Sequence, residues 1–140
     1  MMPRRGSVRR AVTVSRPAAE VWAVVGDPAR LAEWFPGVEA VTVQQGNRFL
    51  QTAAGTVLRE EIVTVDPLAR RLQVRLHGPR IVEHLSTLDV VALGPDRCLV
   101  LYGADAEPAA MALLVAGAAG AGLQRLAAHL EALGERTGGS

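Results

Sequence analysis

The chain has 140 residues, of which 49% are hydrophobic and 21% are charged, and its formal net charge is +1. This length suits one ordinary domain, and this composition excludes a chain that is mostly disordered. A charge so close to neutral argues against a nucleic-acid-binding protein, because such proteins need a clustered basic surface. We therefore expect one folded domain with no nucleic-acid partner.

Positive charge is dense only near the N-terminus, at Arg4, Arg5, Arg9 and Arg10. We interpret residues 1–7 as a solvated basic tail. Neither an apolar run nor a small-residue cleavage site follows these arginines, so no signal peptide is predicted. The chain has a single cysteine, Cys98, which excludes an internal disulfide. These features favour a cytoplasmic protein.

The first predicted elements are a strand and two short helices. Residues 8–15 alternate between two faces in the manner of a strand. Ser15 then stands where a helix N-cap is expected, and residues 18–25 carry apolar side chains at helical spacing. Asp27 is a second candidate N-cap, for a helix over residues 28–35 that a Pro-Gly pair stops.

Six runs with a period of two follow, separated by turn signals such as Gly-Asn and Gly-Pro pairs. They predict strands over residues 38–45, 48–53, 56–66, 71–77, 81–93 and 98–105. Because the connections are short, these strands should form an antiparallel meander. Helical spacing then predicts one long helix over residues 108–133, and residues 136–140 should form a flexible tail.

An antiparallel sheet with one apolar face must cover that face, and only the C-terminal helix is long enough to do so. The sequence therefore predicts an α+β helix-grip fold. In this fold a curved, seven-stranded antiparallel sheet wraps around the long helix, with two short helices after the first strand. The domain should span residues 8–135. The uncharged stretch 109–124 is shorter than the roughly 20 residues of a membrane span, so no integral membrane segment is expected.

Four segments carry a recognisable pattern. Residues 15–22 read SRPAAEVW, residues 27–34 read DPARLAEW, residues 58–62 read LREEI, and residues 122–131 read GLQRLAAHLE. This pattern resembles the START-like superfamily, also called Bet v 1-like or SRPBCC, which includes the polyketide cyclase/dehydrase and lipid-transport proteins. The resemblance implies the same helix-grip fold, with an elongated apolar cavity between sheet and helix. Members hold lipids, hormones, quinones or polyketides there, and some cyclise or dehydrate them.

The strand over residues 81–93 supplies the first candidate site residues. Its other face carries both acids, so the face with His84 and Ser86 should line the cavity. A histidine there would act as a general base near neutral pH, with Ser86 or Tyr102 orienting a substrate oxygen. The alternative is a hydrogen-bonded core histidine. Tyr102 would equally serve as a polar handle for a ligand or as a core tyrosine.

Charges beside apolar rows are the second group of candidates. Arg59 and Glu61 share one face of their strand, and Glu60 shares the other with Leu58 and Ile62. An Arg59–Glu61 pair, or Glu60 reaching the cavity, would anchor a polar ligand group. A salt bridge on the solvent side is the alternative. Arg59 joins His84 and Tyr102 as a candidate catalytic residue.

Small residues mark the first half of the long helix. Stepping back from Leu123 by helical spacing reaches Ala119, Ala116 and Ala112. Their small size predicts empty volume opposite this face, although close packing of helix on sheet would give the same pattern. At the end of the second short helix, Trp34 should touch both core and ligand. The predicted ligand-binding residues are therefore Trp34, Phe35, Arg59, Glu61, His84, Ser86, Tyr102, Ala112, Ala116 and Ala119.

The sequence shows no metal-ligand spacing, nucleophile elbow or phosphate loop, so we expect no metal and no cofactor. The predicted function is the binding of a small hydrophobic or amphipathic ligand, such as a lipid, polyketide or quinone, between sheet and helix. One alternative is a polyketide cyclase or dehydratase that uses His84 and Tyr102. Another is a protein-interaction module, similar to the quinone-chaperone and ribosome-associated branches of the superfamily. The oligomeric state stays open, with a homodimer among the alternatives.

Overall fold

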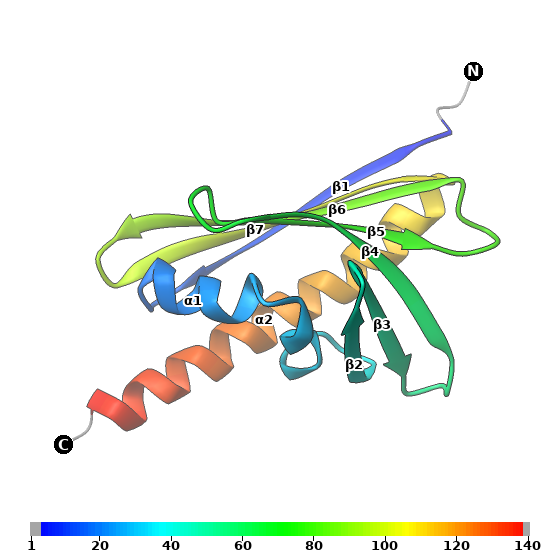
Figure 1. The fold of residues 1–140 in the computed structure, drawn as a ribbon. Coiled ribbons are helices and arrows are strands. Elements are labelled where there is room, and N and C mark those ends of the chain that lie inside the picture. The colour runs from blue at the N-terminus through cyan, green and yellow to red at the C-terminus, as the bar shows by residue number, and fades with distance from the viewer. Residues whose placement is uncertain (1–3, 139–140) are drawn as a thin grey trace.

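The computed structural model describes residues 4–138, with side chains as far as residue 135. Its elements follow the predicted order (Figure 1). The strands are β1 (Gly6–Val14), β2 (Val38–Gln44), β3 (Asn47–Thr52), β4 (Val57–Asp66), β5 (Arg71–His77), β6 (Glu83–Gly94) and β7 (Arg97–Glu107). The helices are α1 (Ala18–Val25), the 3-10 helix η1 (Pro28–Glu33) and α2 (Ala109–Gly138). The expected tails, residues 1–7 and 136–140, are too long, because β1 begins at Gly6 and α2 continues to Gly138. Residues 1–3 and 139–140 lie outside the described residues.

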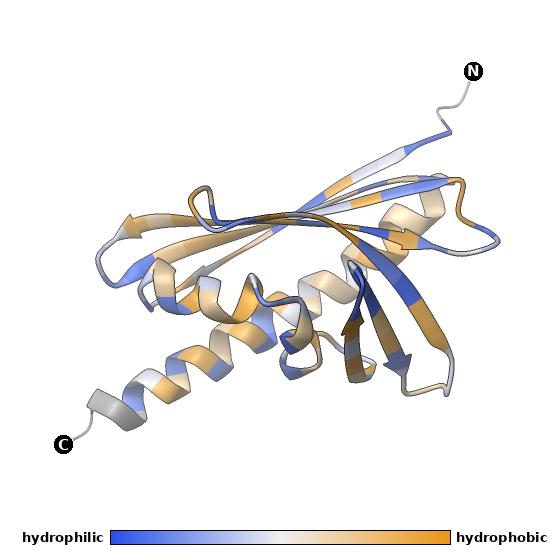
Figure 2. Cartoon of the chain, in the orientation of Figure 1, coloured by the Kyte–Doolittle hydropathy of each residue, from blue (hydrophilic) through white to orange (hydrophobic). Residues whose placement is uncertain are grey.

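The seven strands form one antiparallel sheet in the order β1-β7-β6-β5-β4-β3-β2. Strands β2 to β7 form the predicted meander, and β1 pairs with β7 along its whole length, from Gly6 opposite Ala106 to Val14 opposite Cys98. The sheet covers α2 and the two short helices, and β2 and β3 bend down beside α2 (Figure 1). Apolar and polar residues alternate along its strands (Figure 2). This is the predicted helix-grip fold.

The short helices differ from the sequence prediction in two details. The expected N-cap at Ser15 is wrong, because Pro17 occupies that position without a side-chain cap. The Ser15 backbone N–H instead donates to Glu131 Oε1 on α2, at 3.0 Å. The Asp27 cap is confirmed, since its carboxylate accepts from the Ala29 N–H at 3.0 Å. The helix that it caps is a 3-10 helix, which ends before the Pro-Gly pair.

The alanine face of α2 packs closely on the sheet. Ala112, Ala116 and Ala119 are fully buried, and β1 and β7 are the strands that contact the helix most. A side chain at Gly6 of β1 would approach the Ala112 Cβ to 3.1 Å, so strand and helix are already close at this point. The empty volume expected opposite these alanines is therefore absent. The small residues instead allow α2 to pack closely on the sheet, which was the alternative interpretation of the same pattern.

One helix in the described part of the chain is long and apolar enough to cross a membrane by length and hydropathy, namely Ala109–Glu135 of α2. Hydrophilic residues are confined to its second half (Figure 2). Core helices pass the same test, and the face of α2 that carries Ala116, Leu123 and Leu126 is fully or almost fully buried. This buried face belongs to the core, whereas Leu113 and Leu114 of the same helix are exposed.

Candidate functional site

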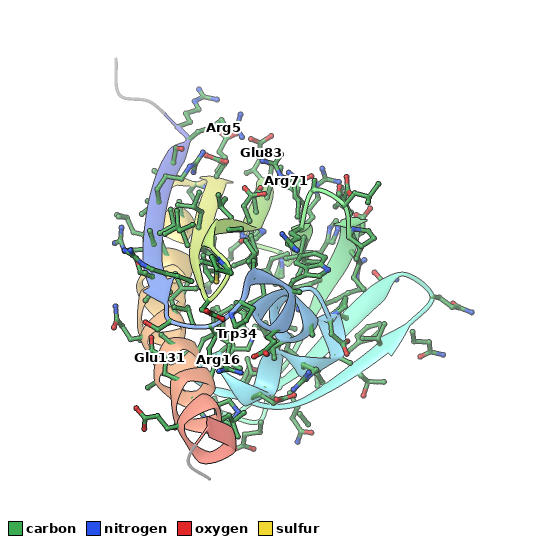
Figure 3. The ribbon with its side chains drawn as sticks, turned by 90° about the vertical axis from the view of Figure 1, so that its left-hand side faces the viewer. Arg5, Arg16, Trp34, Arg71, Glu83 and Glu131 are labelled. Carbon is green, nitrogen blue, oxygen red and sulfur yellow. The ribbon has the colours of Figure 1, made fainter. Side chains whose placement is uncertain are left out.

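A cavity of about 360 Å³ lies between the sheet, the η1–β2 segment and the first half of α2. Its apolar walls come from Leu31, Trp34, Phe35, Val38, Leu50, Leu58, Leu72, Val74, Leu76, Leu88, Met111, Leu114, Val115 and Ala118. The rings of Trp34 and Phe35 meet edge to face, with centroids 5.7 Å apart. Trp34 lies beside α2 (Figure 3), where a side chain at Gly122 would approach its ring to 3.2 Å. Glycine at 122 thus leaves room for the tryptophan that closes this end.

A buried ion pair lies in the cavity wall. Arg48 on β3 and Glu60 on β4 are opposite each other in the strand register, and their side chains are 3% and 10% exposed. Arg48 Nε donates to Glu60 Oε1 at 2.9 Å, and Arg48 Nη1 donates to the Pro28 carbonyl of η1 at 3.2 Å. Because burying two charges is costly, the pair has to compensate through its own attraction and hydrogen bonds.

A chain of three hydrogen bonds runs through the same region. The Leu76 backbone N–H of β5 donates to His84 Nδ1 at 2.8 Å. His84 Nε2 lies 2.9 Å from Ser86 Oγ, which lies 2.7 Å from Tyr102 Oη. Ser86 and Tyr102 line the cavity, whereas His84 lies behind Ser86 and is 2% exposed. The chain therefore connects the β5 backbone to the cavity surface.

Burial shifts the pKa values of the two titratable groups in this hydrogen-bond chain, His84 and Tyr102. It lowers the pKa of His84 to about 4, with a further contribution from the charge of Arg75. Burial also raises the pKa of the Tyr102 hydroxyl, against a smaller opposing effect of its hydrogen bond with Ser86. Near neutral pH both groups are uncharged. Since Nδ1 already accepts from a backbone amide, the arrangement is that of the hydrogen-bonded core histidine, the alternative to a general base.

This sequence and fold match known proteins. Residues 5–131 match the family described as polyketide cyclase / dehydrase and lipid transport. The chain belongs to this family. No curated protein matches the chain significantly.

Several solved structures resemble this member of the polyketide cyclase/dehydrase and lipid-transport family. A protein from Thermobifida fusca is 32% identical, with a TM-score of 0.73 over 86% of this chain and 90% of its own. XoxI from Bacillus cereus is 18% identical, with a TM-score of 0.82 over 89% and 94%. Norcoclaurine synthase from Thalictrum flavum is 16% identical, with a TM-score of 0.71 over 90% and 86%. The latter two establish the shared fold.

Two predicted ligand residues of this family member lie away from the cavity. Arg59 donates to Asn47 Oδ1 at 3.0 Å, and Glu61 Oε1 lies 3.0 Å from His77 Nε2. The hydrogen bond with His77 lowers the pKa of Glu61, with Arg75 contributing through its charge. Placing Arg59 and Glu61 in the cavity was wrong, because the alternation of β4 turns Glu60 inward and these two neighbours outward. They form the solvent-side contacts that were the alternative.

The other predicted residues divide between the cavity and the core. Trp34, Phe35, Ser86 and Tyr102 line the cavity. The three alanines of α2 do not, because the cavity faces a neighbouring stripe of the helix, formed by Met111, Leu114, Val115 and Ala118.

Arg48 is the charged cavity residue that the sequence prediction missed. It alternates with Leu50, which places it on the inner face of β3, but the sequence does not state which strand lies opposite it. Glu60 was named only as an alternative. The pairing of β3 with β4 brings the two together. Among the described residues no group of three or more His, Cys, Asp or Glu side chains is arranged to hold a metal ion.

Proposed function

We propose that the protein binds a small hydrophobic or amphipathic ligand in the cavity between the sheet and α2. The observation that carries this proposal is the cavity itself, about 360 Å³ in volume, with apolar walls interrupted by Arg48–Glu60 and Ser86–Tyr102. Ligand sites in proteins are typically concave and mostly apolar, with a few polar groups that fix the ligand's orientation. Membership of a lipid-transport and polyketide-processing family supports the same reading.

The buried ion pair adds to this argument. A buried pair is often no more stabilising than apolar side chains of the same volume, so stability alone does not account for Arg48 and Glu60. Their position in the cavity wall gives them a role as the polar end of a site for an amphipathic molecule. The cytoplasmic location and the oligomeric state stay predictions.

The test fills the cavity from α2. Ala118 lines the cavity, whereas Ala121 is exposed on the same helix. Ala118→Leu therefore adds a leucine side chain inside the cavity, and Ala121→Leu adds the same side chain at the solvent-exposed surface. Binding of fatty acids, fatty alcohols, naphthoquinones and hydroxyanthraquinones is measured by quenching of tryptophan fluorescence and by calorimetry. We expect Ala118→Leu to weaken binding at least tenfold and Ala121→Leu to leave it unchanged. Equal affinities in the two variants, or no binding by the unmodified protein, would overturn the proposal.

A cofactor-free cyclase or dehydratase is the second candidate. It is favoured by the presence of a carboxylate, Glu60, and a phenol, Tyr102, in one mostly apolar cavity. The solved structure of norcoclaurine synthase, which shares this fold, contains dopamine and hydroxybenzaldehyde, and this supports an enzyme on such a scaffold. In this reading Glu60 would replace His84 as the base. A Glu60→Gln protein that still binds but no longer cyclises a polyketide substrate would support it, and unchanged turnover would exclude that role.

A further inference from the structure

The ion pair in the cavity wall uses only one of its two carboxylate oxygens. Arg48 Nε donates to Glu60 Oε1 at 2.9 Å, and Arg48 Nη2 lies 2.8 Å from the same oxygen. Arginine and a carboxylate frequently pair through both oxygens. The more exposed pair Arg71–Asp89 does so, with Nε donating to Oδ1 at 2.7 Å and Nη2 to Oδ2 at 3.1 Å. The buried pair instead leaves Glu60 Oε2 outside the arginine fork.

Glu60 Oε2 reaches the open volume of the cavity. Among the described side chains, every fully buried nitrogen or oxygen atom has a hydrogen-bond partner. The hydrogen bond of the Glu60 side chain within this part of the chain goes to Oε1, so Oε2 has to be an accessible atom. Because the Glu60 side chain is only 10% exposed and lines the cavity, the space open to Oε2 is the cavity.

The other side of the guanidinium is held as well. Arg48 Nη1 donates to the Pro28 carbonyl of η1 at 3.2 Å, and the arginine side chain is 3% exposed. Arg48 is thus fixed between a backbone carbonyl and Glu60 Oε1. Because this contact fixes one oxygen of the carboxylate, the other is a preoriented acceptor in a mostly apolar wall.

An acceptor in this position discriminates between ligand classes. A ligand that fills the cavity takes the place of water at Oε2, and a ligand without a donor leaves this oxygen unpaired, which is costly. An anionic group would meet the negative charge of the carboxylate. A cationic group would bring a charge that the ion pair, already neutral as a whole, does not compensate. A neutral donor avoids all three costs.

We infer that the cavity selects an apolar ligand with a neutral hydrogen-bond donor, such as a phenol or alcohol hydroxyl, and that Glu60 Oε2 accepts from this donor. This inference rests on the proposed function and specifies the ligand class. The hydroxyl lies at the ion pair, and the apolar body of the ligand packs against the aliphatic and aromatic walls.

Three naphthalenes of similar shape test the inference. 2-Naphthol offers a hydroxyl donor, 2-methylnaphthalene carries a methyl group of similar size in its place, and 2-methoxynaphthalene keeps the oxygen only as an acceptor. Binding is measured by calorimetry at pH 7, where 2-naphthol is neutral. We define the donor ratio as the affinity for 2-naphthol divided by that for 2-methylnaphthalene. The unmodified protein should bind 2-naphthol about five- to tenfold more tightly than 2-methoxynaphthalene.

Glu60→Gln converts the acceptor into a donor. Arg48 needs an acceptor, so the amide oxygen takes the place of Oε1 and the amide NH₂ takes the place of Oε2. The donor ratio should therefore fall at least about tenfold, because a hydrogen bond to a charged acceptor is lost. Binding of 2-methoxynaphthalene should strengthen relative to 2-methylnaphthalene.

A matched control and a second variant accompany this substitution. Glu61→Gln makes the same chemical change one residue further along β4, outside the cavity, and should leave the donor ratio unchanged. Arg48→Met combined with Glu60→Leu replaces the pair by apolar side chains. It should lower the donor ratio as Glu60→Gln does, and it provides the test if Glu60→Gln does not fold.

The outcomes distinguish this inference from the function on which it rests. If all three probes bind, Ala118→Leu blocks them, and the donor ratio survives both changes at Glu60, then Glu60 is not the acceptor while ligand binding stands. A donor ratio that falls equally in Glu61→Gln would overturn the inference in the same way. No binding of any probe or of the wider ligand panel would overturn the cavity function and this inference together.

Discussion

Arg48 and Glu60 are the buried arginine and the buried carboxylate of the described chain, with 3% and 8% of the whole residue exposed. Their charges are compensated by each other and by the Pro28 carbonyl. Removing one partner is costly, because the remaining charge would then lie in an apolar wall without compensation.

We predict that Arg48→Met lowers the free energy of unfolding by about 3–5 kcal/mol, because it leaves the Glu60 carboxylate buried and unpaired. Arg48→Met combined with Glu60→Leu should recover most of that loss. Urea denaturation at pH 7 measures both variants. If the double variant is as unstable as the single one, the loss comes from packing of the arginine side chain rather than from the unpaired charge.

Helix α2 presents two different stripes to the rest of the molecule. Ala112, Ala116 and Ala119 are fully buried in close contact with the sheet, whereas Val115 and Ala118 line the cavity. The two stripes are one residue apart along the helix, so the same substitution can be compared in a filled and in an empty environment.

We predict that Ala116→Leu lowers the free energy of unfolding by about 1–3 kcal/mol or more, because the added carbons have no space between helix and sheet. Ala118→Leu should change it by less than about 1 kcal/mol, because the cavity accommodates the side chain. Urea unfolding of the two variants, with Ala121→Leu as the exposed control, measures the difference. Equal destabilisation at positions 116 and 118 would contradict the assignment of the two stripes.

The stability of the whole molecule depends on pH through the buried histidine. The pKa of His84 falls from 6.5, the value for an exposed histidine, to about 4 in the folded protein. The unfolded chain therefore binds this proton more readily, and stability is lost as the pH falls from about 6.5 towards 4. Arg75, His77 and Asp105 act on the same ring through their charges, with burial as the larger cause.

We predict that the free energy of unfolding falls by about 2 kcal/mol between pH 7 and pH 5 as a result of His84. His84→Gln lacks the titrating group and should lose correspondingly less over this interval, although it is less stable at pH 7. Carboxylates with a lowered pKa, such as Glu33 and Asp105, begin to contribute below about pH 4.5. Equal pH dependence of the two proteins would show that His84 is not buried as a neutral ring.

Much of the fold was predictable because its signals are local. Period-two runs and turn residues predicted the strands, and the alternation of β6 and β7 correctly placed His84, Ser86 and Tyr102 on the inner face. The N-cap of α1 was not predictable in this way, because the Ser15 amide binds Glu131, 116 residues later in the chain. Sequence spacing carries no information about such a contact.

The sequence by itself determined the family, the order of elements and the inward face of most strands, since periodicity and turn chemistry act over a few residues. The tertiary structure decided where the empty volume lies, because small residues on a helix fit a close contact as well as a cavity. It also decided which charges enter the cavity. Arg48 and Glu60 meet only because β3 pairs with β4 in one register, and His84 accepts the Leu76 N–H only because the β5–β6 pairing ends at Val74.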